Sequence, residues 1–213
     1  MVKVKINNVE YSVQTSWDEV DPDKLMLCEN FREELECLST IPKDIIDRAT
    51  DEQLFPFYTL TSFIHEIGEM PMIDTVDISQ ESYEKLELAR ERMKIGKEYN
   101  KILISARTYY PEEKDTVRLL SHGISIVNQI ILFLDKYTEM QGSEHTNDEL
   151  MAGIESLDAF GSWGTAFVLA GKDILKLRGV LDMKAITVYE ALRYNFRESK
   201  YIKNLFEIRN PKK

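Results

Sequence analysis

Residues 116–135 read TVRLLSHGISIVNQIILFLD, and the apolar side chains among them recur every three or four positions. That is the spacing of one face of an α-helix. The face comprises Val117, Leu120, Ile124, Val127, Ile131 and Leu134, and it is widened by Ile126, Ile130 and Phe133. We predict that this is the longest helix of the chain, that it begins at Pro111, and that its apolar surface is buried on more than one side.

The region before this segment is also predicted to be helical. Asp21 and Pro22 form a helix start, with Asp as the N-cap and Pro at the first helical position. One amphipathic helix is expected over residues 25–38, because apolar residues recur there at helical spacing between acidic ones. Capping boxes are predicted at residues 16–19 and 50–53, where Ser or Thr is followed three positions later by Glu or Gln.

A small β-hairpin is predicted at the N-terminus. Apolar and polar residues alternate over residues 2–6 and again over residues 9–13, which is the period of a strand. Asn7 and Asn8 lie between them and tolerate the positive φ that a two-residue hairpin turn requires. Since a lone hairpin is marginally stable, we expect one face to pack on a helix or the free edges to pair with a neighbouring chain.

The fold class predicted from these patterns is mainly α, a helical bundle-like domain with a small N-terminal β-hairpin. The hairpin and the helical body occupy residues 1–140, and a polar break follows them. Residues 146–213 form a C-terminal helical segment, either as a second unit or as part of the same domain. Within it we expect two short helices near the end, through residues 189–192 and 202–206.

The chain is acidic, but its C-terminal part is basic. Asp and Glu number 37 against 27 Lys and Arg in 213 residues, a formal net charge of −10 that disfavours a nucleic-acid partner. Residues 172–213 carry 11 Lys or Arg against 5 Asp or Glu. This asymmetry predicts either contact with an acidic partner, including the acidic part of a second copy, or packing of the two regions within one molecule.

Cys28 and Cys37 are nine residues apart in what is expected to be one helix, so they are predicted to lie on opposite faces and to form no disulfide with each other. With no disulfide framework, a reducing compartment such as the cytoplasm is expected. The longest apolar runs are far below the roughly 18 residues of a membrane span. Neither membrane insertion nor signal-directed export is therefore expected.

No catalytic, cofactor-binding or metal-binding residue is predicted. His65 opens a stretch like a zinc-protease helix, but Glu69 stands where the second His is needed. Gly171 and Lys172 are like the last Gly-Lys pair of a phosphate loop. However, Ala166 stands at the position of the loop's first glycine, and Asp173 stands where its Ser or Thr is needed. No Ser lies in a GxSxG elbow. An enzyme whose site is assembled from distant carboxylates and histidines is retained as an alternative.

Two tryptophans and a neighbouring phenylalanine are the candidate partner-binding residues. Trp17 and Trp163 each lie beside a predicted helix start, among small or polar neighbours. Either one could fix the entry of the chain into its helix or act as an exposed anchor for a partner. Phe167, one helical turn after Trp163, is the third candidate.

Several segments carry a family resemblance. They are YSVQTSWDEV at residues 11–20, LSTIPKD at 38–44, and LAGKD, LDMK and VYEAL at 169–173, 181–184 and 188–192. Their order resembles that of tail assembly chaperone-like and related morphogenesis proteins of tailed bacteriophages.

The resemblance implies a non-enzymatic role in building a phage particle, as a chaperone of tail components or as a tail or neck component of the virion. The implied partners are tail, neck or portal-proximal proteins, and the implied location is the host cytoplasm during assembly, with retention in the virion for a structural component. Burial of apolar helix faces between subunits makes a homo-oligomer the natural corollary. The alternative is a cytoplasmic helical adaptor or regulatory binding module with no viral connection.

Overall fold

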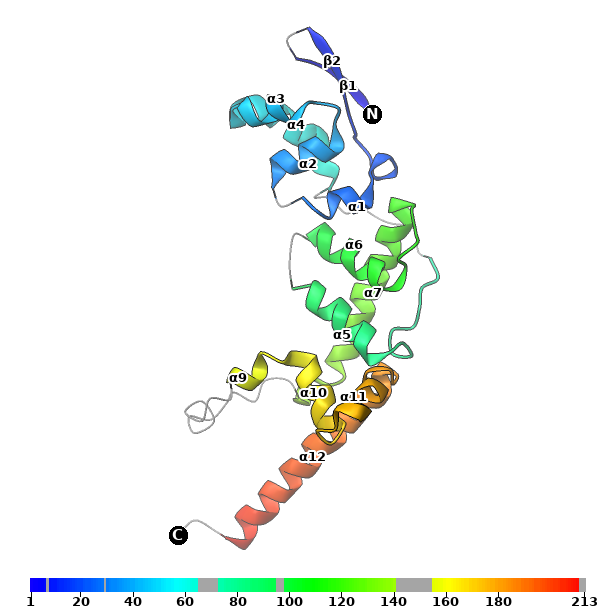
Figure 1. Ribbon diagram of the computed structural model, residues 1–213, viewed down its shortest axis with the longest axis vertical. Coiled ribbons are helices and arrows are strands. Elements are labelled where there is room, and N and C mark those ends of the chain that lie inside the picture. The colour runs from blue at the N-terminus through cyan, green and yellow to red at the C-terminus, as the bar shows by residue number, and fades with distance from the viewer. Residues whose placement is uncertain (7, 29, 65–72, 95–97, 141–154, 211–213) are drawn as a thin grey trace. The chain divides into compact units, whose positions relative to one another are not determined.

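The computed structural model describes residues 1–6, 8–28, 30–64, 73–94, 98–140 and 155–210 (Figure 1). It is mainly α-helical, with a two-stranded antiparallel sheet at the N-terminus, which confirms the predicted fold class. The chain divides into two compact units. Unit 1 comprises Met1–Thr75 and Ala89–Val127, and unit 2 comprises Val76–Leu88 and Asn128–Lys213.

Neither unit is a continuous piece of the sequence. In unit 2 the Tyr83 N–H donates to the carbonyl of Met183 at 2.7 Å, and the Ala185 N–H donates to the carbonyl of Glu81 at 2.8 Å. These main-chain bonds join segments about a hundred residues apart, which local sequence patterns do not reveal. The division predicted at residues 140–146 stays a prediction.

The N-terminal hairpin forms as predicted. Strands β1 (Val2–Ile6) and β2 (Val9–Val13) pair so that Ile6 lies opposite Val9, and Asn8 in the turn has a φ of +66°. The predicted packing of one hairpin face is also confirmed. Val13 is fully buried in a cluster with Leu35, Ile41, Ile46 and Leu54, and Val4, Ile6 and Tyr11 pack against this cluster.

The helices that begin in the N-terminal two thirds of the chain are mostly short. They are η1 (Trp17–Glu19), α1 (Pro22–Leu25), α2 (Phe31–Leu38), α3 (Lys43–Arg48), α4 (Asp51–Thr61), η2 (Ser62–Ile64), α5 (Tyr83–Arg92), α6 (Glu98–Tyr109) and α7 (Thr116–Asp135). A short turn, η3 (Thr138–Met140), follows α7. The helix starts predicted at Asp21 and Thr50 are confirmed, because Asp21 accepts a bond from the Asp23 N–H and Thr50 forms both bonds of a capping box with Gln53.

Two predictions near the N-terminus are wrong. The single helix over residues 25–38 is broken, because the Asn30 side chain accepts hydrogen bonds from the backbone N–H groups of Arg32 and Glu33 and so starts a new helix, α2. Asn is among the best N-cap residues. Ser16 makes no side-chain capping bond, and the Glu19 carboxylate accepts instead from the Thr15 N–H at 3.0 Å.

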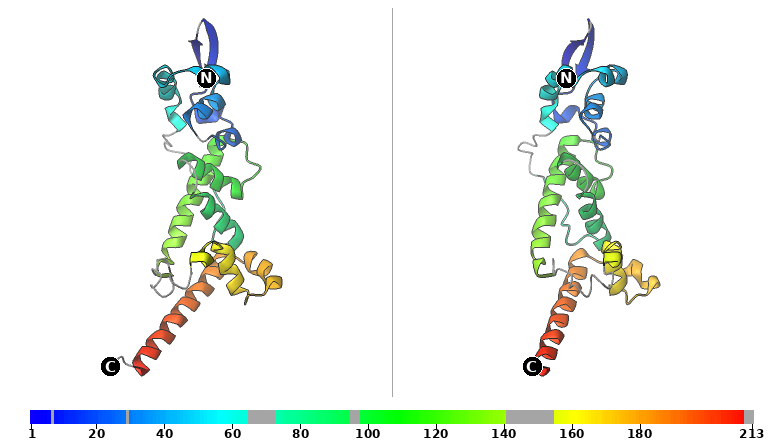
Figure 2. Two further views of the ribbon diagram at one scale, coloured as in Figure 1. Left: turned by 60° about the vertical axis from the view of Figure 1, so that its left-hand side comes forward. Right: turned by 90° about the vertical axis from the view of Figure 1, so that its left-hand side faces the viewer.

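The lengths of two helices also differ from the prediction. Helix α7 begins at Thr116 instead of Pro111, since the Asp115 side chain accepts a bond from the Arg118 N–H at the start of the helix. The two short helices expected at the end are one continuous helix, α12 (Ala185–Arg209) (Figure 2). With 25 residues against 20, α12 is longer than α7, which was expected to be the longest helix.

By length and composition α7 could cross a membrane, contrary to the expectation that no segment would qualify. Polar residues interrupt its apolar runs, but the average over 18 residues is still apolar. Within the protein, 44% of this 18-residue stretch is buried. The core helix of a soluble protein can have the same length and composition. The absence of membrane association stays a prediction.

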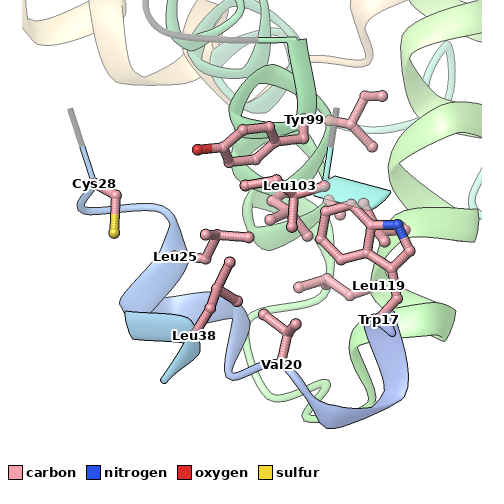
Figure 3. Close-up of a cluster of buried hydrophobic side chains, with 12 residues drawn as sticks. Trp17, Val20, Leu25, Cys28, Leu38, Tyr99, Leu103 and Leu119 are labelled. Atoms are coloured by element: carbon pink, nitrogen blue, oxygen red, sulfur yellow. The ribbon is translucent and has the colours of Figure 1, made fainter. Parts of the chain in front are cut away.

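The main core of unit 1 surrounds Trp17, Tyr99 and Leu103 (Figure 3). Trp17 contacts Phe63 edge to face, with ring centroids 5.5 Å apart. The buried Tyr99 hydroxyl donates to a carboxylate oxygen of Glu34, also buried, at 2.5 Å. A buried carboxylate needs such a donor because it has lost its water. The pair therefore links α2 to α6.

His122 gives unit 1 an expected pH dependence. Its buried ring stacks on Tyr110, with centroids 3.8 Å apart, and burial lowers the pKa of the imidazole below its ordinary value of about 6.5. The unfolded chain then binds a proton more readily than the folded chain, so the free energy of unfolding should fall as the pH drops below 6.5. Denaturant midpoints at pH 7.5 and 5.5 measure this loss, and His122→Phe should reduce it. An equal loss in His122→Phe would contradict the assignment.

Candidate protein–protein interface

The C-terminal part of unit 2 exposes many large apolar side chains. Four helices build it: α9 (Glu155–Asp158), α10 (Gly161–Leu169), α11 (Ile174–Leu181) and α12. The exposed side chains are Leu157, Phe160, Trp163, Val168, Ile174, Leu175, Met183, Ile186, Tyr194, Tyr201, Ile202, Phe206 and Ile208. Contiguous exposed apolar surface typically marks a binding site for another protein, a membrane or a ligand.

Three aromatic rings lie in a row along α10. Phe160 and Trp163 have ring centroids 5.9 Å apart, and the Trp163 and Phe167 rings stack at 5.1 Å with an interplanar angle of 19°. Their spacing of three and four residues places them on one side of the helix. Trp163 remains 42% exposed and Phe160 55% exposed, so this row of rings has a free face.

The end of α10 explains a motif that had suggested a phosphate loop. The Lys172 N–H donates to the Phe167 carbonyl, and the Gly171 N–H donates to the Val168 carbonyl, at 2.9 and 3.0 Å. Gly171 and Lys172 both have positive φ, at +68° and +61°. This is the Schellman pattern of a helix C-terminus, in which Gly is favoured. The pair caps a helix and turns the chain toward α11.

Of the three predicted partner-binding residues, the structure brings Trp163 and Phe167 together and places Trp17 elsewhere. Trp17 is only 8% exposed and lies in the core of unit 1. The interpretation of Trp17 as an exposed anchor is therefore wrong. Its neighbours Phe63 and Tyr99 are distant in sequence, so the local pattern could not show that they cover the indole.

The first half of helix α12 is anchored to other elements of unit 2. Val188 and Tyr189 are buried, and the Tyr189 ring lies 5.0 Å from the rings of both Phe133 and Tyr137. The Tyr137 hydroxyl donates to Glu190 at 3.0 Å. Among the described residues, the side-chain bonds from α12 to other elements end at Arg197, which pairs with Glu139 at 2.7 Å.

Beyond this anchor α12 presents apolar side chains to solvent. We call the exposed residues Tyr194, Tyr201, Ile202, Phe206 and Ile208 the distal α12 surface. Their exposed fractions lie between 58% and 76%. At 100° per residue, Tyr194, Tyr201 and Ile208 share one side of the helix, whereas Ile202 and Phe206 lie on another. Both views in Figure 2 show the distal half of α12 running away from α10 and α11.

The distal part of α12 is basic as well as apolar. Residues 194–209 contain four Lys or Arg and two Glu, in a chain with a net charge of −10. A helix with apolar side chains on two sides buries them only when it is covered on both. The arrangement suits a contact between proteins, in which apolar burial supplies affinity and charge supplies orientation.

The described part of unit 1 also has an open hollow. An open hollow of about 490 Å³ on unit 1 is lined in part by Phe31, Arg32 and Phe55. The Arg32 guanidinium donates hydrogen bonds to two backbone carbonyls and to the Asp51 carboxylate, so it is already paired within the protein. Within the described residues there is no group of three His, Cys, Asp or Glu that could hold a metal. His65 and His145 lie outside these residues.

The prediction that Cys28 and Cys37 lie on opposite faces of one helix is wrong. Cys28 follows α1, Cys37 is in the last turn of α2, and their sulfur atoms are 3.0 Å apart. Asn30, a strong N-cap residue two positions after Cys28, was the sequence signal that could have revealed the break between the helices.

Comparison with protein-family models, with curated proteins and with solved structures finds no match for this chain.

Proposed function

We propose that this chain is a non-enzymatic assembly protein of a tailed bacteriophage that acts through protein–protein contacts. It serves either as a tail assembly chaperone or as a structural component of the tail or neck. The phage assignment rests on the resemblance of residues 11–20, 38–44 and 169–192 to such proteins. The assembly role rests on the distal α12 surface, whose large apolar side chains are 58–76% exposed and lie mostly beyond the anchored first half of the helix.

The partner proposed for the distal α12 surface is a second copy of the chain. The surface is apolar and basic, whereas residues 1–171 contain the large acidic excess of the protein. Opposite charges on one chain favour head-to-tail contacts between copies, which close into a ring when the rotation between copies permits. Other phage proteins of the tail, neck or portal-proximal region would then bind the assembled form in the host cytoplasm.

Self-association should depend on salt and on the distal α12 surface. We expect light scattering to give a mass above that of the 24.8 kDa monomer at low salt and a smaller mass at high salt, because salt screens the charges. The double variant Ile202→Gln and Phe206→Gln should weaken self-association at least 100-fold, since each buried side chain contributes about 1.5–3 kcal/mol. Gln preserves helix propensity.

Leu27→Gln provides the matched control, because Leu27 is 80% exposed but belongs to unit 1. This variant should associate like the unmodified protein. A monomer at both salt concentrations would contradict self-association and favour a chaperone or adaptor that binds only its client. Finding the chain in purified particles of the phage that encodes it would support the structural role, and its absence from them would favour the chaperone.

A further inference from the structure

The two cysteines of the chain form a close pair at the edge of the unit 1 core. Their sulfur atoms are 3.0 Å apart, and both thiols point to one acceptor, the Lys24 carbonyl, at 3.5 Å from Cys28 and 3.7 Å from Cys37. Figure 3 shows Cys28 beside Leu25 and Leu38. An S–S bond is about 2.05 Å long, so the two sulfurs need to approach by only about 1 Å to form one.

We propose that Cys28 and Cys37 are a reversible dithiol–disulfide site that reacts with low-molecular-weight disulfides such as oxidised glutathione. The bond would join Cys28, three residues after the end of α1, to the last turn of α2. Between the two cysteines lie the N-cap Asn30 and the buried Glu34, which accepts the Tyr99 hydroxyl bond. Oxidation would therefore lock the segment that holds α2 against α6.

The two thiols have different roles because their exposure differs. Cys28 is only 4% exposed, whereas Cys37 is partly exposed. Burial is the largest cause that raises the pKa of the Cys28 thiol, and Cys37 and the acidic residues Glu34 and Glu33 raise it further. A disulfide reagent in solution therefore reacts first with Cys37 and forms a mixed disulfide with it. Cys28 then attacks this mixed disulfide and completes the bond between the two cysteines.

The reaction consists of two thiol–disulfide exchanges. The Cys37 thiolate attacks one sulfur of oxidised glutathione, which forms a mixed disulfide and releases one glutathione thiolate. Cys28 then loses its proton and attacks the Cys37 sulfur, which releases the second glutathione. In total two protein thiols give up two electrons and two protons, and one glutathione disulfide is reduced to two glutathione thiols.

The test titrates the purified chain with glutathione buffers of increasing oxidised fraction. Acid quenching, alkylation of free thiols and intact mass analysis then count the thiols, and the chain has only two cysteines. We expect both thiols to disappear together, in a product whose intact mass is that of a single chain without a disulfide to another chain. At a given glutathione ratio, the disulfide should be at least tenfold more favoured in the folded chain than in concentrated guanidinium, because the fold holds the sulfurs together.

Two single variants test the assigned roles. Cys28→Ser should accumulate the mixed disulfide at Cys37, because the resolving thiol is missing, whereas Cys37→Ser should react at least tenfold more slowly, because Cys28 is buried. Circular dichroism checks that both variants fold. Two free thiols in the most oxidising buffer, products linked only between chains, or equal disulfide formation in folded and denatured chains would overturn the proposal.

Discussion

Trp17→Ala is expected to lower the free energy of unfolding of unit 1 by about 3–5 kcal/mol, which is typical when a buried aromatic side chain is removed. The indole lies in the core with Tyr99, Leu103 and Leu119, and Phe63 contacts it edge to face. The loss combines the transfer of apolar surface to water with the cavity left behind. Denaturant unfolding followed by circular dichroism measures it.

Trp163→Ala is the matched control, because it deletes the same side chain at an exposed position. We expect less than about 1 kcal/mol of destabilisation, since Trp163 is 42% exposed and its ring contacts with Phe160 and Phe167 lie along α10 itself. Fluorescence gives an independent check: the emission of Trp17 in Trp163→Phe should lie at shorter wavelength than that of Trp163 in Trp17→Phe. Equal destabilisation by the two alanine variants would contradict the placement of Trp17.

Gly123→Ala is expected to destabilise unit 1 by about 2–3 kcal/mol, although alanine normally favours a helix. A Cβ atom at Gly123 would lie 2.4 Å from the carbonyl oxygen of Ile102 and 2.5 Å from its Cγ2. A backbone oxygen cannot move aside like a flexible side chain, so α6 and α7 would have to separate. Thermal unfolding of the variant should show a lower midpoint.

Gly179→Ala should have the opposite effect. Gly179 lies inside α11, and a Cβ atom there meets nothing within 4 Å. The substitution should therefore stabilise unit 2 by about 0.5–1 kcal/mol through backbone entropy. A stabilising effect of Gly123→Ala would show that α6 and α7 do not approach as closely as the structure has them.

Local sequence patterns predicted those elements whose bonds are themselves local. The pairing of Ile6 with Val9 in the hairpin, the Asp21 cap and the capping box at Thr50 and Gln53 involve residues within a few positions of each other. The alternation of apolar residues over residues 2–6 and 9–13 predicted the two strands themselves. Hydrogen bonds between such close neighbours can be predicted from the residue types and their spacing.

Helix boundaries were predicted less well because periodicity continues across a break. Leu25, Cys28 and Phe31 keep helical spacing although α1 ends at Leu25, since the Asn30 cap competes with helix continuation. Conversely, no strong breaker separates Leu192 from Ile202, and α12 continues through both. A periodic pattern indicates helix without stating where each helix ends.

The candidate interface shows the same limit. Trp163 and Phe167 are one helical turn apart, so their stacking follows from the geometry of α10. Trp17 has similar polar neighbours in sequence, but it is buried by residues distant in sequence, which include Phe63, Tyr99 and Leu119. The proximity of the two cysteines likewise depends on how α2 folds back after α1.

From its sequence alone, then, the chain is mainly helical, begins with a hairpin and separates an acidic body from a basic C-terminal part. These properties follow from residue spacing and composition, which act over a few positions or over the whole chain. The tertiary structure decided which tryptophan is core and which is surface, that residues 76–88 join the C-terminal unit, and that the cysteines meet. Each of these depends on contacts between residues far apart in sequence, whose energies become favourable only when the intervening helices have packed.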